Sequence, residues 1–138
     1  SQCAVADGVR QGAYVLADAP NGRPDVILIA TGSEVGLVMA ARRSLQARNV
    51  MARVVSMPSW DLFDAQPQSY RDQVLLPTVR ARLAVEAGAS QGWHRYVGDR
   101  GDVLGVDHYG ASAPGDVVMR EYGFTADNVC KRAMALLG

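Results

Sequence analysis

The sequence of 138 residues lacks several features that would assign a function class directly. Lys and Arg together number 14, as do Asp and Glu, so no excess charge favours nucleic acid or an anionic membrane as a partner. No apolar run approaches the roughly 18 residues of a membrane span. The first residues have neither the positive start nor the apolar core of a secretory signal, so we expect a cytoplasmic protein.

Cysteine and histidine are also scarce. Cys3 and Cys130 lie at opposite ends of the sequence, form no C-x-x-C pair and match no zinc spacing. A disulfide between them is one interpretation, but we favour two free thiols in a reducing cytosol. The two histidines, His94 and His108, have no carboxylate or cysteine at ligand spacing, so we predict no metal site.

Signature motifs of nucleotide and hydrolase sites are missing as well. Gly32 and Gly36 do not make G-x-G-x-x-G, and there is no G-x-x-x-x-G-K-[ST]. Ser33, Asp107 and His108 follow the chain order of an α/β-hydrolase triad, but Ser33 is not in a G-x-S-x-G elbow. If the strand continues through them, the adjacent Asp107 and His108 would also point to opposite sides. We therefore do not predict a hydrolase.

What the sequence does contain is an alternation of strands and helices. Residues 25–30 include five consecutive apolar residues, typical of a strand buried on both faces, and a helix over about 33–48 follows. Further strands are predicted at 12–17, 52–57, 82–86 and 103–107, and further helices at about 59–63, 67–74, 92–98, 115–122 and 127–137. We predict Thr125 as the N-cap of the last helix. This pattern predicts a three-layer α/β/α domain with a mostly parallel five-stranded sheet. The gap between the first two strands is too short for a parallel crossover, so we expect these two strands to form an antiparallel pair, with the first strand at an edge of the sheet.

Two places at the carboxyl ends of strands are candidates for ligand binding, because open α/β sheets bind ligands at that edge. Thr31, Gly32 and Ser33 form a turn at a helix start, where free amides and the helix dipole favour an anion or a substrate phosphate. A tight turn with a well-capped helix explains the same residues, and we favour that interpretation. His108 follows the last strand and is the second candidate.

Aromatic residues gather in the Pro-rich connection after residue 57, where Trp60, Phe63 and Tyr70 occur. Such residues either cap a core or mark an interface with another protein or domain. A long irregular connection with large apolar groups must bury them somewhere, so we favour an interface or domain contact for residues 60–63.

Nine short segments, in order and with their spacing kept, resemble the C-terminal domain of transketolases. They are IATGSEV at 29–35, RVVSMPS at 53–59, LFDAQ at 62–66, YRDQVLLP at 70–77, AVEAG at 84–88, GW at 92–93, YVG at 96–98, GASAP at 110–114 and GFTADNV at 123–129. The extra residue at Leu75-Leu76 and the position of His108 depart slightly from the family pattern. The resemblance covers nearly all of the chain after Gly12, which implies a linker remnant at 1–12 and the domain at 13–138.

The resemblance implies a transferase that moves a two-carbon ketol unit between sugar phosphates in the pentose phosphate pathway. Such enzymes use thiamine diphosphate with Mg²⁺ or Ca²⁺ and are homodimers of three-domain subunits. The G-D-G motif that binds the diphosphate and the adjacent asparagines that follow it are not in this sequence. The resemblance therefore implies that this segment binds no cofactor or metal, has no catalytic residue and is inactive alone.

In this interpretation the partners of the segment are the other two domains and a second subunit, with sugar phosphates as substrates of the full enzyme. The start of the sequence, which is small, polar and without Met, fits a segment cut from a longer polypeptide. The competing hypothesis is a free-standing regulatory module that binds a small molecule or an anion. An exposed apolar patch, where neighbouring domains would dock, distinguishes the two hypotheses.

Overall fold

The computed structural model describes residues 8–32, 34–87, 91–105 and 123–138. Its elements are, in chain order, β1 (Tyr14–Ala17), the 3-10 turn η1 (Pro20–Gly22), β2 (Val26–Ala30), α2 (Glu34–Ala47), β3 (Ala52–Ser56), α3 (Trp60–Asp64), α4 (Gln68–Val74), β4 (Arg82–Val85), α5 (His94–Val97), β5 (Asp102–Leu104) and α7 (Ala126–Leu136). The helix expected at 115–122 lies outside the described residues. None of the described helices is long and apolar enough to cross a membrane.

The five strands form one sheet in the order β1-β3-β2-β4-β5. The strands β2, β3, β4 and β5 are parallel, and β1 is antiparallel at the edge, as predicted. The short gap had suggested that β1 pairs with the next strand, β2, and this was wrong. Both edges of β2 are occupied by parallel neighbours, so β1 pairs with β3 instead, with Tyr14 opposite Ser56.

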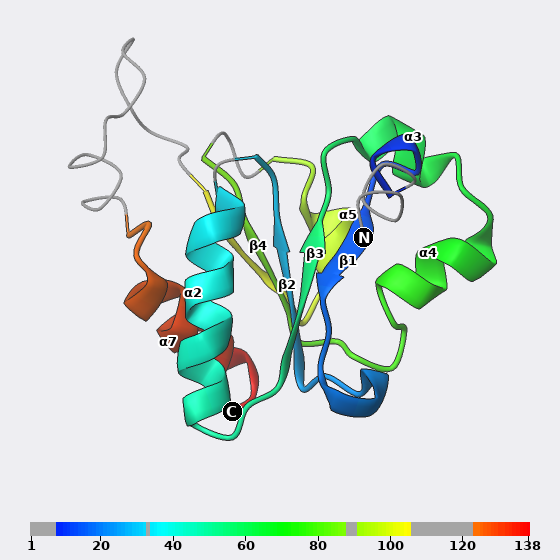
Figure 1. Cartoon of the computed structure of the whole chain (residues 1–138). Helices are drawn as coiled ribbons and strands as arrows, with labels where there is room; N and C mark the ends of the chain where they lie inside the picture. Colours follow the sequence, from blue (N-terminus) through cyan, green and yellow to red (C-terminus); the bar gives the residue numbers. More distant parts are fainter. Residues whose placement is uncertain (1–7, 33, 88–90, 106–122) are drawn as a thin grey trace, which may run out of the picture.

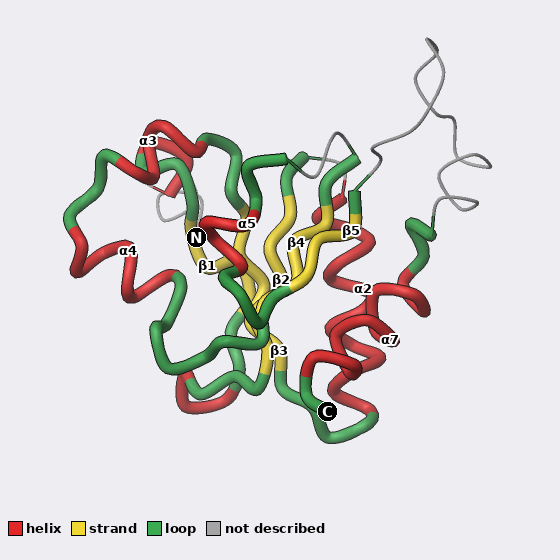
Figure 2. The backbone as a smooth tube through the Cα atoms, turned by 180° about the vertical axis from the view of Figure 1, so that it is seen from behind, coloured by secondary structure: helices red, strands yellow, loops and turns green. Residues whose placement is uncertain are grey.

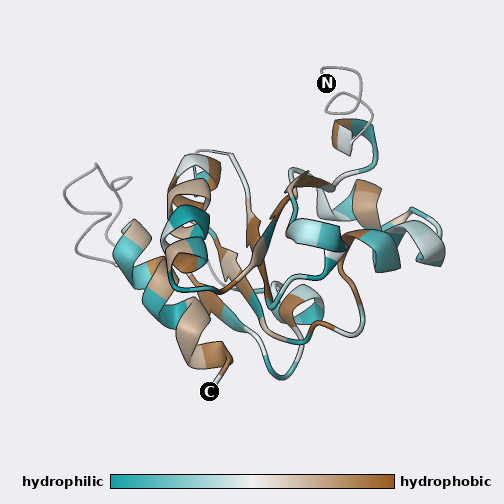
Figure 3. Cartoon of the chain, turned by 60° about the horizontal axis from the view of Figure 1, so that its bottom comes forward, coloured by the Kyte–Doolittle hydropathy of each residue, from teal (hydrophilic) through white to brown (hydrophobic). Residues whose placement is uncertain are grey.

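Helices cover both faces of the sheet, which confirms the three-layer prediction (Figures 1 and 2). The residues of β2 alternate between two cores because successive side chains in a strand point to opposite faces. Val26, Leu28 and Ala30 pack into the core beneath α2 and α7. Ile27 and Ile29 pack into the core beneath α3, α4 and α5. Figure 3 shows the hydrophobic ribbon concentrated in the strands between helices that also carry hydrophilic residues.

The last helix begins as its sequence predicts. The Thr125 hydroxyl accepts a hydrogen bond from the backbone N–H of Asn128 at 3.1 Å, which satisfies one of the free amides at the start of α7. Val129 and Ala133 then bury one face of the helix in the core. Cys130 is a free thiol in the same core, whereas Cys3 lies outside the described residues.

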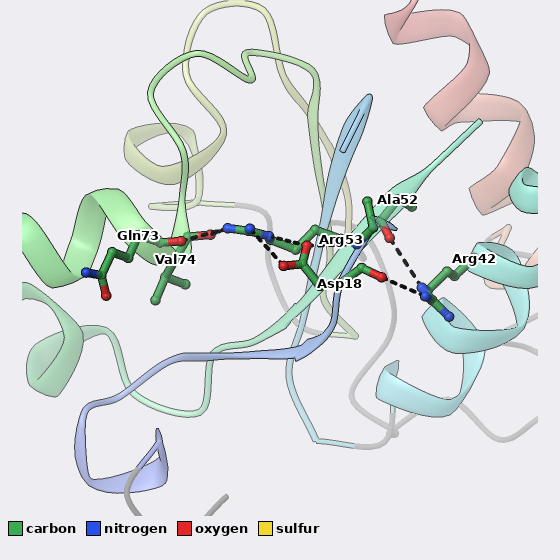
Figure 4. Close-up of polar contacts among 7 residues, drawn as sticks. Asp18, Arg42, Ala52, Arg53, Gln73 and Val74 are labelled. Carbon is green, nitrogen blue, oxygen red and sulfur yellow. Dashed lines mark hydrogen bonds and ion pairs between the residues drawn. The ribbon is translucent and has the colours of Figure 1, made fainter. Parts of the chain in front are cut away.

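A polar cluster fixes the connection between β3 and β4 at the amino end of the parallel strands (Figure 4). The Arg53 side chain leaves β3 and pairs with both carboxylate oxygens of Asp18, at 2.9 and 3.1 Å. Its other terminal nitrogen donates to the backbone carbonyls of Gln73 and Val74, at 2.7 and 3.2 Å. This places a cation at the carboxyl end of α4, where the helix dipole is negative.

Candidate functional site

The strand order creates a crevice at the carboxyl ends of β2 and β4. These strands are neighbours, but β2 leads to α2 on one face of the sheet while β4 leads to α5 on the other (Figure 2). Connections that diverge in this way leave a gap, and in open α/β sheets the gap is the usual ligand position.

A pocket of about 470 Å³ occupies this place, and we call it the switch-point pocket. Its described lining residues come from the ends of β2, β3 and β4, from α3 and from the start of α5: Thr31, Met57, Pro58, Ser59, Trp60, Asp61, Glu86 and Trp93. The Thr31 hydroxyl donates to the Glu86 carboxylate at 2.6 Å, so the ends of the two diverging strands are tied together.

Only part of the predicted anion site falls within the described structure. Thr31 lines the switch-point pocket. Gly32 is exposed with a φ of +51°, and a Cβ built there would meet no atom within 4 Å. This positive φ is one that glycine adopts at no steric cost, so the turn itself accounts for the residue. Ser33 and His108 lie outside the described residues, and their binding role stays a prediction.

Glu86 was not predicted as a site residue. Its position was the available signal, because it directly follows a buried strand at the ligand-binding edge. Within the described lining, Asp61 and Glu86 are the charged side chains, and both are acidic. The chemistry of this lining therefore suits a neutral or cationic group better than an anion.

The aromatic residues divide between the core and the surface. Phe63, Trp93 and Tyr96 are buried in the core, so the interface expected for residues 60–63 is wrong for Phe63. Trp60 is half-buried, with its ring edge-to-face on Trp93 at a centroid separation of 5.1 Å. Leu62, in contrast, is exposed.

The buried Tyr96 anchors a polar group beside these rings. Its hydroxyl donates to Asp64 at 2.9 Å, and Asp64 also pairs with Arg95 at 3.0 Å. Burial, followed by the hydrogen bond to Asp64, raises the pKa of Tyr96 to about 12. The Arg95 guanidinium stacks over the rings of Trp60 and Tyr96 at 5.3 and 4.8 Å.

A second pocket, of about 450 Å³, lies between α4 and α5 and includes Arg71, Arg82 and Arg95 in its lining. Its charges are largely used within the domain. The Arg82 side chain donates to the backbone carbonyls of Leu75, Leu76, Val79 and Tyr96. Burial lowers the pKa of Arg82, and the charge of Asp72 opposes that shift. We therefore assign the second pocket a structural role.

The described residues of the site do not fit a thiamine diphosphate and metal centre. Among the residues that the structure describes, no group of three or more His, Cys, Asp and Glu side chains is placed to hold a metal ion. His94 is exposed on α5. A diphosphate in the switch-point pocket would face Asp61 and Glu86, which have the same charge sign.

Fold and site together define a three-layer, doubly wound α/β domain with one antiparallel edge strand. Residues 12–125 match the family model described as "Transketolase-like TK C-terminal domain", and the chain belongs to this family. The predicted resemblance is thereby confirmed, and the free-standing alternative is not favoured.

The relatives that match are transketolases. The Geobacillus stearothermophilus transketolase is 59% identical over 132 residues, which are 96% of this chain and 20% of that protein. The Mycobacterium tuberculosis (strain H37Rv) transketolase is 55% identical over 93% of this chain and 19% of its own length. The transketolase structure from Leishmania mexicana superposes with a TM-score of 0.84 at 39% identity, over 95% of this chain and 18% of that one. The chain thus spans about one fifth of the length of the curated relatives it matches.

Proposed function

We propose that a longer protein carries this chain as its C-terminal domain, with residues 1–12 as the linker, and that the whole protein is a transketolase. In this proposal the enzyme transfers a two-carbon ketol unit from a ketose phosphate to an aldose phosphate. The observation that supports it is the match over nearly all of this chain but only about one fifth of proteins that are themselves transketolases. We also propose a cytoplasmic homodimer that acts in the pentose phosphate pathway, as the family assignment suggests.

In the proposed enzyme this domain supports packing within and between subunits and does not carry the chemistry. Two features favour that role. One is the acidic described lining of the switch-point pocket. The other is that the charges of the second pocket are used within the domain, with Asp64 paired to Arg95 and Arg82 bonded to backbone carbonyls. Thiamine diphosphate and Mg²⁺ or Ca²⁺ would be bound by the remaining domains and would supply the group that accepts the ketol unit.

The test is ketol transfer from xylulose 5-phosphate to ribose 5-phosphate, with thiamine diphosphate and Mg²⁺. The isolated chain and the longer parent chain are assayed in parallel at equal molar concentration. We expect turnover by the parent and none by the isolated chain. Turnover by the isolated chain would contradict the supporting role, and an inactive, folded parent would contradict the transketolase assignment.

A further inference from the structure

One corner of the domain joins the segment through which the chain enters, residues 8–12, to the start of α3. The Gly12 carbonyl accepts a hydrogen bond from the backbone N–H of Ser59 at 3.0 Å. The approach is so close that a Cβ built on Gly12 would lie 2.2 Å from the backbone nitrogen of Phe63. The entering segment is therefore held against α3 (Figure 1). This contact lies next to the switch-point pocket, which Ser59 also lines.

This corner holds most of the exposed large apolar side chains of the described residues. Three such side chains are exposed: Val9 (46%), Leu62 (46%) and Leu137 (41%). Val9 lies one turn before Gly12, and its carbonyl accepts from the N–H of Gly12. Leu62 belongs to the part of α3 that Gly12 contacts. Leu137 is elsewhere, at the end of α7.

The described lining of the pocket at this corner is acidic, while the entering segment contributes the exposed Arg10. Asp61 and Glu86 line the switch-point pocket beside the half-buried Trp60, and no Lys or Arg is among the described lining residues. Arg95 stacks on Trp60 but is paired with Asp64. An apolar surface with an aromatic residue and carboxylates fits a protein surface that presents apolar groups and a basic side chain.

We propose that this surface, the junction face (Val9, Trp60, Asp61, Leu62 and Glu86), docks against the transketolase polypeptide that precedes the domain. The inference rests on the proposed function. Single exposed hydrophobic residues are common on protein surfaces. Here, however, the relatives are about five times longer than this chain, and a C-terminal domain is reached from that remainder through the entering segment. The junction face is thus the surface nearest to where the preceding polypeptide arrives.

The test compares amide hydrogen exchange of the isolated chain and the longer parent, in peptides that cover residues 8–12 and 59–65. Docking should slow exchange there in the parent. Leu62→Glu in the parent should raise the undocked population, and with it exchange, by about tenfold or more, because one buried leucine contact is lost. Leu137→Glu is the matched control, with a side chain of similar exposure. A glutamate at the carboxyl end of a helix is unfavourable to the helix dipole, so Leu137→Glu destabilises its own helix more than Leu62→Glu does. A larger effect of Leu62→Glu on exchange therefore cannot come from helix destabilisation.

The acidic part of the surface has its own matched pair. Asp61 and Asp127 are both exposed and both occupy the second position after a Ser or Thr cap, in α3 and α7. Asp61→Lys in the parent should increase exchange in the two peptides, and the increase should fall as salt is added. Asp127→Lys should leave exchange in these peptides as in the unchanged parent.

Equal exchange in the parent and the isolated chain would overturn the proposal. So would equal effects of Leu62→Glu and Leu137→Glu, or protection that the isolated chain acquires by self-association as its concentration rises. These results are separate from the ketol-transfer assay. An inactive parent that still protects the two peptides would refute the proposed function and retain the docking surface, and an active parent without protection would do the reverse.

Discussion

The Arg53 cluster allows a double-mutant cycle with a definite expected sign. The Arg53 side chain is 6% exposed and that of Asp18 is 39% exposed, so water can reach the carboxylate but not the guanidinium. Arg53→Met keeps the apolar stem but removes a charged donor from the Gln73 and Val74 carbonyls. Hydrogen bonds to charged groups contribute about 1.5–3 kcal/mol, and Asp18 returns to water, so we expect a loss of about 3 kcal/mol in the free energy of unfolding.

Asp18→Asn leaves the buried Arg53 cation without its counterion. Breaking a buried pair by removing one partner costs about 3–5 kcal/mol, but the amide oxygen and the two carbonyls still accept hydrogen bonds, so we expect about 2 kcal/mol. Once Arg53 is absent, Asp18 has no buried charge to neutralise. The double variant should therefore be more stable than the sum of the single losses predicts, by about 1.5–2 kcal/mol.

The assay is urea unfolding, followed by circular dichroism and by the fluorescence of Trp60 and Trp93. Arg80→Met is the control, because the Arg80–Asp99 pair is exposed on both sides and should contribute little to stability. Additivity of the two single variants within about 0.5 kcal/mol would refute the reasoning, since independent sites add to that precision. A loss for Arg80→Met as large as that for Arg53→Met would also refute it.

Three further outcomes follow from single contacts. Gly12→Ala should lower the free energy of unfolding by about 3 kcal/mol or more, because φ is +86° and the new Cβ would meet backbone atoms. Gly32→Ala should lower it by about 1–2 kcal/mol, because only its positive φ is unfavourable for alanine. The midpoints of urea unfolding compare the two variants. The pKa of Tyr96 is about 12 in the fold, whereas that of an unfolded tyrosine is about 10. The free energy of unfolding should therefore fall by about 1.4 kcal/mol per pH unit as pH rises between these two values. In unfolding curves measured from about pH 9 to 11, Tyr96→Phe should flatten this fall. Thr31→Val should lower unfolding free energy by about 2 kcal/mol because it removes the donor to Glu86, and an unchanged midpoint would show that this hydrogen bond contributes no net stability.

Local patterns made much of the fold predictable. Five apolar residues in succession predicted β2, which is buried on both faces, and Thr125 predicted the start of α7. The partner of β1 was not predictable in the same way, because it depends on which strand edges remain open after the parallel strands assemble. The burial of Phe63 likewise depends on Tyr70 and Tyr96, which pack around its ring from other segments.

The candidate site was less predictable because its defining contact is non-local. Thr31 and Glu86 are 55 positions apart in sequence and meet only because β2 and β4 are neighbours in the sheet. From sequence, Thr31 belonged to a turn at the start of a helix, a context that favours anions. The contact with Glu86 places a negative carboxylate beside Thr31, where the sequence suggested only the positive end of a helix dipole.

The negative charge beside Thr31 distinguishes this domain from doubly wound domains that bind phosphates at the same edge of the sheet. At about 4 Å and an effective dielectric constant of about 20, two like unit charges repel by about 4 kcal/mol. A phosphate hydrogen-bonded to Thr31 would lie close to the Glu86 carboxylate, which already accepts the Thr31 hydroxyl at 2.6 Å. A basic side chain at the same place would be attracted instead. Among the described residues, the edge that binds phosphates in other doubly wound sheets is therefore acidic here, so this topology does not by itself assign a phosphate site.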